Sequence, residues 1–188
     1  MSDYSDRQNK VECVVGKPVH IWPEERLFVY GLVKAVKPKT IVEIGVSAGI
    51  LGVCICRALK ENGEGIYIGV DDWSTKHGGK AKSSDIPRNN ILEDGTPEKF
   101  FKLVSSDSQA FLNKQPDKKY DIIIIDANHD YEHANKDTIE AMRVAKYLTL
   151  THDTENLEEV REACRDLGYK GVWVKSSRGY WMYNVEED

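Results

Sequence analysis

Thr40-Ile-Val-Glu-Ile-Gly-Val-Ser-Ala-Gly49 is the stretch that decides the fold of this chain. A short apolar run that ends in a glycine turn and leads into the apolar segment Ile50–Lys60 is typical of a buried parallel strand followed by a helix. Four more such runs follow, at Gly65–Val70, Lys102–Ser105, Tyr120–Ile125 and Tyr147–Thr151. Their alternation with helical stretches predicts an α/β fold with a Rossmann-like, doubly wound, mostly parallel sheet.

The remaining segments complete the predicted domain. Helices are expected at Pro23–Val36, Asn135–Lys146 and Asn156–Leu167. An antiparallel hairpin is expected from Gly171–Lys175 and Gly179–Asn184. We expect one domain over residues 1–188, with residues 1–17 loosely ordered and with Trp173 and Trp181 available as the interface of a homo-oligomer.

Composition narrows the class of protein. The chain has 188 residues, 40% of them hydrophobic and 30% charged, which is ordinary for one globular domain. Its net charge of −5 argues against nucleic acid as a partner. Because no apolar run approaches the ~20 residues that cross a bilayer, and Met1–Lys10 lacks an apolar signal core, we expect no membrane partner and a cytoplasmic location. The four cysteines lack the pairs of a zinc site and are expected to be buried and reduced.

The glycine turn has the spacing G-x-x-x-G, and not the G-x-G-x-x-G of a dinucleotide site. An acidic residue followed by this turn resembles the first motif of the class I methyltransferases that use S-adenosylmethionine (SAM). In that family the turn holds the methionine part of the cofactor, and the acid reaches its ammonium group. The resemblance implies that Glu43, Gly45, Ser47 and Gly49 line a cofactor pocket. The alternative is a strand-to-helix turn with no ligand.

Two further strand ends carry polar residues that suit a nucleoside. Asp71 follows the second strand, where a carboxylate can accept both hydroxyls of a ribose. Trp73 beside it is expected either against the adenine or in the core. Ser106 and Asp107 follow the third strand, at a position that lies near the adenine in the methyltransferase family. Asp107 is equally expected as a helix N-cap, and both roles are compatible.

The most informative residues follow the fourth and fifth strands, in Asp126-Ala-Asn-His129-Asp-Tyr131 and His152-Asp153-Thr154. They resemble the small-molecule and sugar O-methyltransferases of the macrocin and mycinamicin type, which carry Ile-Asp-x-x-His-x-Tyr and a later His-Asp-Thr. The resemblance implies that His129 is the general base and that Asp126, His152 and Asp153 are ligands of Mg²⁺ or another divalent cation. We expect Asp126 to bind the cofactor as well. In the alternative, the histidines only cap loops. Tyr131 and Asp137 are expected to be structural, Asp137 as a charge near a helix N-terminus.

The chemistry of methyl transfer explains this choice of residues. Transfer from a sulfonium is an in-line displacement, so the acceptor oxygen must be held against the methyl group. A neutral alcohol must also lose its proton. An imidazole can accept that proton, and a divalent cation can lower the pKa of the hydroxyl.

Two features depart from the family pattern. Ala145–Leu148 has no Pro-Gly-Gly turn between helix and strand, so the preceding helix must end early or the connection must be strained. Ser74–Thr96 is long and polar, and we expect it to be either a lid over the cofactor or a solvated loop. Its basic residues suggest an acidic or phosphorylated acceptor.

The sequence therefore predicts a SAM-dependent O-methyltransferase that modifies a hydroxyl of a small molecule, with a sugar and a phenol both compatible. N-methylation stays open. Two other functions are carried forward, a non-catalytic SAM-binding module of the same fold and a nucleotide-dependent oxidoreductase, which the glycine spacing disfavours.

Overall fold

A computed structural model of the chain describes residues 21–74, 81–168 and 171–185. The segment 1–17 that was expected to be loosely ordered lies outside these residues. Within the described ranges, no helix is both long enough and apolar enough to cross a membrane.

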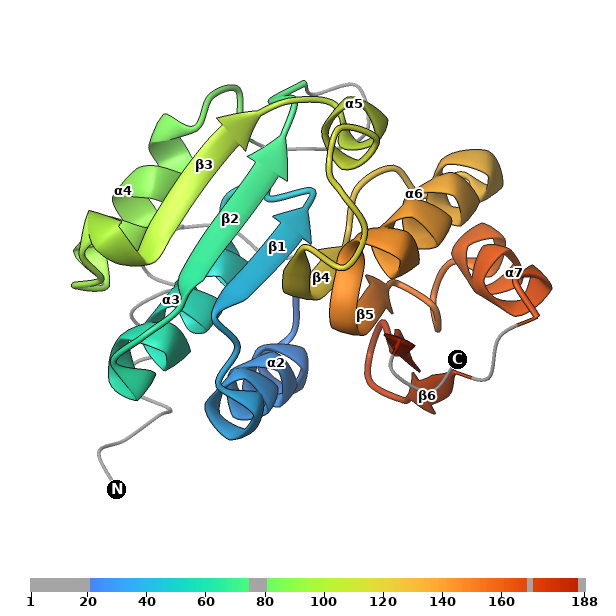
Figure 1. Cartoon of the computed structure of the whole chain (residues 1–188), viewed down its shortest axis with the longest axis horizontal. Coiled ribbons are helices and arrows are strands. Elements are labelled where there is room, and N and C mark those ends of the chain that lie inside the picture. Colours follow the sequence, from blue (N-terminus) through green and yellow to red (C-terminus); the bar gives the residue numbers. More distant parts are fainter. Residues whose placement is uncertain (1–20, 75–80, 169–170, 186–188) are drawn as a thin grey trace.

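A seven-stranded sheet forms the centre of the molecule, with the strand order β3-β2-β1-β4-β5-β7-β6 (Figure 1). Strands β1 to β5 pair in parallel, whereas β7 runs antiparallel to both β5 and β6. This confirms the predicted mostly parallel sheet with a C-terminal antiparallel hairpin. The strands are β1 Thr40–Ile44, β2 Ile66–Asp71, β3 Phe101–Ser105, β4 Tyr120–Ile125, β5 Ala145–His152, β6 Val172–Val174 and β7 Tyr180–Asn184.

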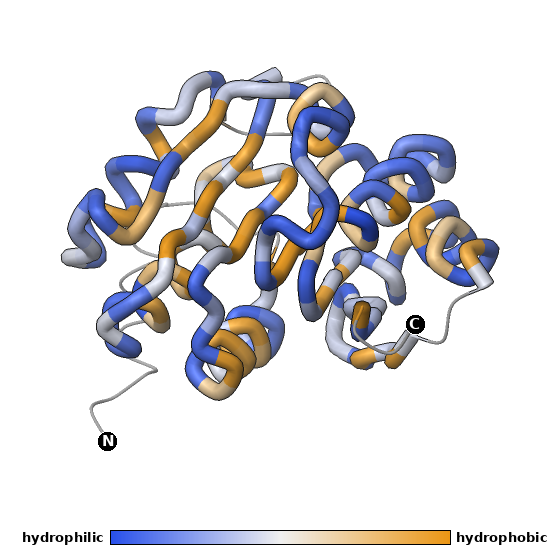
Figure 2. The backbone as a smooth tube through the Cα atoms, in the orientation of Figure 1, coloured by the Kyte–Doolittle hydropathy of each residue, from blue (hydrophilic) through white to orange (hydrophobic). Residues whose placement is uncertain are grey.

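Helices cover both faces of the sheet, as the two hydrophobic clusters show. One cluster joins α2 and α3 to one face, and the other joins α5 and α6 to the opposite face. In Figure 2 the hydrophobic residues gather along the central strands, while the outer turns of α6 are hydrophilic. The helices are α2 Pro23–Val36, α3 Ile50–Asn62, α4 Asp85–Glu93, η1 Glu98–Phe100, α5 Ser108–Leu112, α6 Tyr131–Val144 and α7 Glu158–Asp166.

Strand alternation decides which polar side chains face α2. Successive side chains of a strand point to opposite faces, so residues two apart share a face. Ile41 and Leu150 pack in the cluster with α2 and α3. Glu43 and His152 each follow one of these residues by two positions and therefore lie on the α2 face.

The connection between α6 and β5 shows how the chain manages without a glycine turn. α6 begins at Tyr131, where the Asp130 carboxylate caps it by accepting the backbone N–H of His133 at 3.0 Å. It ends at Val144, and Ala145 is already extended, with φ −73° and ψ 146°. The early helix end is thus the alternative that the structure adopts.

The predicted start of that helix at Asn135 is four residues late, and the role expected for Asp137 is wrong. Asp137 lies in the second turn of α6 and is fully buried, where it accepts a hydrogen bond from Gln109 Nε2 at 2.5 Å. It ties α6 to α5 instead of neutralising a helix N-terminus.

Part of the predicted loop Ser74–Thr96 is helical. α4 buries Pro87 and Ile91, and Asn90 Nδ2 donates to the carbonyl of Ala48 at 2.8 Å. This half of the segment is therefore fixed beside the glycine turn. Residues 75–80 lie outside the described residues, so the lid stays a prediction.

Two further expectations concern buried side chains. Trp181 is 1% exposed and packs beneath α6 and α7, so it is not available as an interface residue of the folded chain. Trp173 is 38% exposed. Cys54, Cys56 and Cys164 are buried free thiols as predicted, and Cys13 lies outside the described residues.

Candidate active site

The glycine turn after β1 lies directly against the residue that follows β4. Gly45 has φ +90°, and a Cβ there would stand 2.0 Å from the carbonyl oxygen of Asp126. Gly49 has φ +77°, and a Cβ there would stand 2.5 Å from the Cβ of Pro87. Both positions require glycine because a side chain has neither the conformation nor the space.

Asp71, predicted to bind a ribose, holds the glycine turn in place. Its Oδ2 accepts the backbone N–H groups of Val46 at 2.9 Å and Ser47 at 2.8 Å. Its Oδ1 accepts the N–H of Trp73 at 2.7 Å. The structure thus brings Asp71 and the turn together, and each carboxylate oxygen has two lone pairs for such contacts.

Glu43 lies beneath the turn and is 1% exposed. The hydroxyl of Tyr67 donates to its Oε2 at 2.5 Å. Burial raises the pKa of Glu43 well above its usual range, the hydrogen bond from Tyr67 only partly offsets this, and the nearby charges of Asp126 and Asp71 add to it.

Asp107 has the N-cap geometry that was one of its two expected roles. Its carboxylate accepts the N–H of Ala110 at 3.0 Å at the start of α5. Ser106 donates its hydroxyl to the carbonyl of Asp107 at 3.0 Å, and its N–H is bonded to the carbonyl of Asp71 at 3.1 Å. Both residues lie at the same sheet edge as the turn.

Four predicted residues meet at the carboxyl ends of β4 and β5, and we call Asp126, His129, His152 and Asp153 the acid–histidine cluster. His129 Nε2 lies 2.9 Å from Asp153 Oδ2 and 3.3 Å from Asp126 Oδ1. His152 Nδ1 lies 3.3 Å from Asp126 Oδ1 and 3.7 Å from Asp153 Oδ1. The side chain of His129 is 34% exposed and that of His152 only 1%, so His129 is the histidine that faces solvent.

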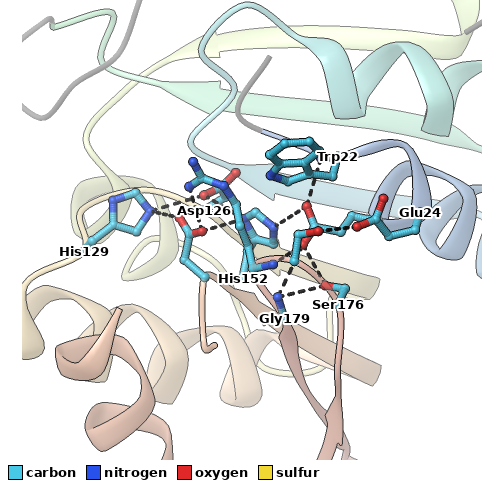
Figure 3. A network of polar contacts seen from close by, with 11 residues as sticks. Trp22, Glu24, Asp126, His129, His152, Ser176 and Gly179 are labelled. Atoms are coloured by element: carbon cyan, nitrogen blue, oxygen red, sulfur yellow. Dashed lines mark hydrogen bonds and ion pairs between the residues drawn. The ribbon is translucent and has the colours of Figure 1, made fainter. Parts of the chain in front are cut away.

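Two residues that the sequence did not single out complete the cluster. Arg178 Nη1 lies 2.9 Å from Asp153 Oδ1. Glu25, from the first turn of α2, places its Oε2 3.4 Å from His152 Nε2. Figure 3 shows His152 between Asp126 and His129 on one side and the turn of Ser176 and Gly179 on the other.

The charges of the cluster shift its pKa values in opposite directions. Burial raises the pKa of Asp126, but the charges and hydrogen bonds of His152 and His129 outweigh it and hold this pKa well below its usual range. Burial lowers the pKa of His129, yet hydrogen bonds with Asp126 and Asp153 raise it to about 9. Burial also lowers the pKa of His152, but the charge of Asp126 and the contacts with Asp126 and Glu25 raise it to about 10.

The cluster also has the donors of a cation site. Asp126, His152 and Asp153 each offer one ligand atom, and these atoms lie within 4.8 Å of one another. Among the described residues, neither ring nitrogen of the buried His152 finds a hydrogen bond of good geometry. Two carboxylates and an imidazole are common ligands of divalent metal ions. The residues therefore fit a divalent cation.

Backbone strain marks three positions of this sheet edge. Ser47, Trp73 and Asp153 have φ values of +49°, +58° and +65°. Such conformations cost about 1–3 kcal/mol outside glycine and cluster at functional sites. The three residues follow β1, β2 and β5, whose carboxyl ends lie at the same edge of the sheet.

The residues that sequence reasoning missed have their partners far away in the chain. Glu25 was read only as an acid in the first turn of a helix, and its contacts with residues 176–179 span more than 150 positions. Nothing in the sequence distinguishes Arg178 from other basic residues. The alternation of side chains along β2 was the one signal that could have indicated Tyr67, because this residue faces the same side of the sheet as Glu43.

The chain is similar to known methyltransferases. A family described as "Methyltransferase domain" matches residues 42–154. This range begins in β1 and ends one residue after the acid–histidine cluster. A search of curated proteins gave no match.

Solved structures with the same fold include proteins that bind cofactors. The cofactor-bound protein Rv0187 from MTB is 13% identical, with 100% of this chain and 93% of that chain covered at a TM-score of 0.79. The O-methyltransferase from Bacillus cereus in complex with SAH is 16% identical, with 97% and 90% covered at 0.70. The O-methyltransferase TomG from Streptomyces achromogenes, in complex with SAM, is 12% identical, with 96% and 88% covered at 0.67.

Proposed function

This chain belongs to the methyltransferase domain family, and from that premise we propose that it transfers the methyl group of SAM to a hydroxyl of a small molecule. One observation supports this proposal above the others. The glycine turn proposed to hold the cofactor lies against the backbone of Asp126, the first member of the acid–histidine cluster. A methyl donor on the turn and an acceptor at the cluster would thus be neighbours, as an in-line displacement requires.

The cofactor would bind along the carboxyl edge of β1, β2 and β3. The turn brings backbone N–H groups and glycine surfaces to the methionine part, while the Asp71 carboxylate can accept from the ribose. Glu43 would meet the ammonium group, whose positive charge favours an ionised carboxylate. The residues proposed to bind the cofactor are Glu43, Gly45, Ser47, Gly49, Asp71, Ser106, Asp107 and Asp126.

His129 is the proposed general base. Its imidazole is the exposed member of the cluster, and Asp126 and Asp153 orient it through Nε2. A base must be unprotonated to accept a proton, and the pKa of about 9 keeps most of this imidazole protonated at pH 7 in the metal-free chain. Positive charge placed near the two carboxylates would lower that pKa.

Asp126, His152 and Asp153 would hold a divalent cation. Such an ion, when bound, supplies positive charge that lowers the pKa of an acceptor hydroxyl and orients its oxygen. Arg178 fixes the Asp153 carboxylate for this role from the β6–β7 turn.

The finer parts of the proposal concern the acceptor. The pattern Asp126 to Tyr131 with His152 to Thr154 supports an acceptor class like that of the macrocin-type enzymes, with a sugar hydroxyl as the first compound to test. Lys82 supports an acidic acceptor, whereas Arg88 lies in α4 and is paired with Glu98.

A turnover assay tests this function. SAM labelled in its methyl group is incubated with hydroxylated small molecules, with EDTA and then with added Mg²⁺, and methylated product is detected by mass spectrometry. His129→Ala is expected to lower turnover by about 10²–10⁴-fold, the usual contribution of a general base, with the binding of S-adenosylhomocysteine (SAH) retained.

His133→Ala is the matched control, because His133 is an exposed histidine that pairs only with Asp130 among the contacts found for it. It should turn over like the wild type. Equal turnover of the His129 variant would remove the general-base assignment. Tight SAM binding with no methylated product would favour the non-catalytic SAM-binding module, and oxidation of a reduced nicotinamide would favour the oxidoreductase.

A further inference from the structure

Glu25 is buried beneath the acid–histidine cluster and accepts hydrogen bonds from two separate places in the fold, the turn between β6 and β7 and the residue before α2. Its side chain is 0% exposed. Oε1 accepts from Ser176 Oγ at 2.7 Å and from the N–H groups of Arg178 at 2.7 Å and Gly179 at 3.3 Å. Oε2 accepts from the N–H of Trp22 at 3.0 Å. All of these partners donate hydrogen bonds, so both side-chain oxygens of Glu25 act as acceptors, as those of an ionised carboxylate do.

The same oxygen that accepts from Trp22 faces His152 Nε2 at 3.4 Å. Two lone pairs at this distance would repel, so Nε2 must carry the hydrogen. Tyr180 holds the ring from the side, with the ring centroids 4.7 Å apart and the residue paired with His152 in the β5–β7 register. The orientation and the tautomer of His152 are thus fixed from outside the cluster.

Fixing the hydrogen on Nε2 leaves the lone pair of the neutral imidazole on Nδ1. That atom lies 3.3 Å from Asp126 Oδ1 and 3.7 Å from Asp153 Oδ1. Either a hydrogen on Nδ1 or a divalent cation can face these two carboxylates, and a metal ion would bind the neutral imidazole through this lone pair. A metal-bound histidine usually donates its other ring N–H to a carboxylate, which sets its tautomer and strengthens its metal-binding nitrogen.

We propose that Glu25 is a positioning residue that makes Nδ1 of His152 a metal ligand, so that the site selects a transition-metal ion over Mg²⁺. This rests on the cation site of the proposed function. Mg²⁺ prefers oxygen ligands and keeps its waters, whereas an imidazole nitrogen suits ions such as Zn²⁺ and Mn²⁺. Glu25 therefore influences which metal is bound without contacting it.

Glu25→Gln separates this role from general support of the fold. The glutamine oxygen can replace Oε1 toward Ser176, Arg178 and Gly179. Its amide N–H₂ then faces His152 and moves the imidazole hydrogen to Nδ1, where it blocks the metal. Calorimetry with Zn²⁺ should show affinity reduced about 10–100-fold, the usual effect of removing such a partner. The affinity for Mg²⁺, measured in the same way, should fall less.

Glu24→Gln is the matched control, one residue earlier and bonded to Ser177 on the surface. It should bind Zn²⁺ like the wild type. Should Glu25→Gln not fold, ¹⁵N NMR of histidine-labelled wild type with Zn²⁺ tests the proposal directly, with the His152 signal assigned by its loss in His152→Asn. The expected state is a hydrogen on Nε2 and a metal-bound Nδ1.

The outcomes separate the two proposals. Equal Zn²⁺ affinity in folded Glu25→Gln, or a hydrogen on Nδ1 in the Zn²⁺-loaded wild type, overturns the role of Glu25 and leaves the cation site standing. No binding of Zn²⁺ by the wild type overturns the role of Glu25, and binding of neither Zn²⁺ nor Mg²⁺ overturns the cation site as well. SAM binding is measured separately and decides the methyltransferase assignment.

Discussion

Two buried glutamates on the α2 side of the sheet, Glu25 at the acid–histidine cluster and Glu43 at the glycine turn, have pKa values shifted in opposite directions. Burial acts to raise the pKa of both. The pKa of Glu25 is nevertheless lowered to about 2 by its ion pair with His152 and by hydrogen bonds from Ser176 and Trp22. Glu43 has the hydroxyl of Tyr67 as its hydrogen-bond donor among the described contacts, and its pKa stays well above the usual range. The hydrogen bonds and ion pair of Glu25 outweigh the effect of its burial on the pKa, whereas the single hydrogen bond to Glu43 does not.

The difference matches the ligands proposed for the two regions. The acid–histidine cluster is assembled with its own cationic groups, His129, His152 and Arg178, and is electrostatically complete without a ligand. Among the described residues, Glu43 at the glycine turn forms no ion pair, and a cationic ligand such as the ammonium group of SAM would supply one. Removing either carboxylate should therefore have different consequences.

The largest effect is expected from Glu25→Ala. This change leaves the buried His152 and four hydrogen-bond donors without their acceptor, and breaking a buried ion pair costs about 3–5 kcal/mol. Urea denaturation should show the free energy of unfolding reduced by that amount. A loss below about 1 kcal/mol would contradict the account of Glu25, since that is the size of one ordinary hydrogen bond.

A smaller effect of opposite sign is expected from Glu43→Gln. The folded-state pKa of Glu43 is raised, so its stabilising contribution is full below the unfolded pKa of ~4.3 and is lost as the pH rises toward the folded pKa. Glutamine stays neutral and avoids this loss. The variant should therefore gain stability relative to the wild type as the pH rises from about 4 to 8.

Urea denaturation at both pH values checks this prediction. The same variant should bind SAM more weakly, because its amide cannot pair with an ammonium group. A difference in stability from the wild type that does not change with pH would show that Glu43 is ionised in the folded chain.

The smallest effect is expected from Ser176→Ala, which removes one of the donors to Glu25. The loss should be about 0.5–1.5 kcal/mol of unfolding free energy. Ser177→Ala is its control, since Ser177 bonds the exposed Glu24 and surface changes usually stay within about 0.5 kcal/mol. Equal effects of the two serine variants would mean that Glu25 does not depend on its donors.

The sequence predicted the framework of these regions because local signals determine it. β1 and β4 were predicted to the residue, since each is a continuous apolar run with clear boundaries. α4 was missed because only Pro87 and Ile91 are buried in it, too few for a helical period to be read. The start of α6 was missed because Asp130, its N-cap, and Tyr131 were assigned to the motif that follows the fourth strand.

The site was predicted as a set of strand ends, without the connections that join them. Glu43, Asp71, Asp126 and His152 each follow from their place at the end of a strand, since such ends meet at one edge of a sheet. Glu25 could not be found in this way, because its role depends on a helix and a hairpin turn that lie at opposite ends of the chain. Long-range contacts of this kind leave no local pattern.

Calorimetric titration of the wild-type chain with SAH tests the central claim most directly, with Asp71→Ala as its companion. We predict a Kd of about 1 μM, or about −8 kcal/mol, and a loss of about tenfold or more in the variant, since a hydrogen bond to a charged group is worth about 1.5–3 kcal/mol. Absence of SAH and SAM binding by the folded wild type would contradict the proposal that this chain transfers methyl groups from SAM.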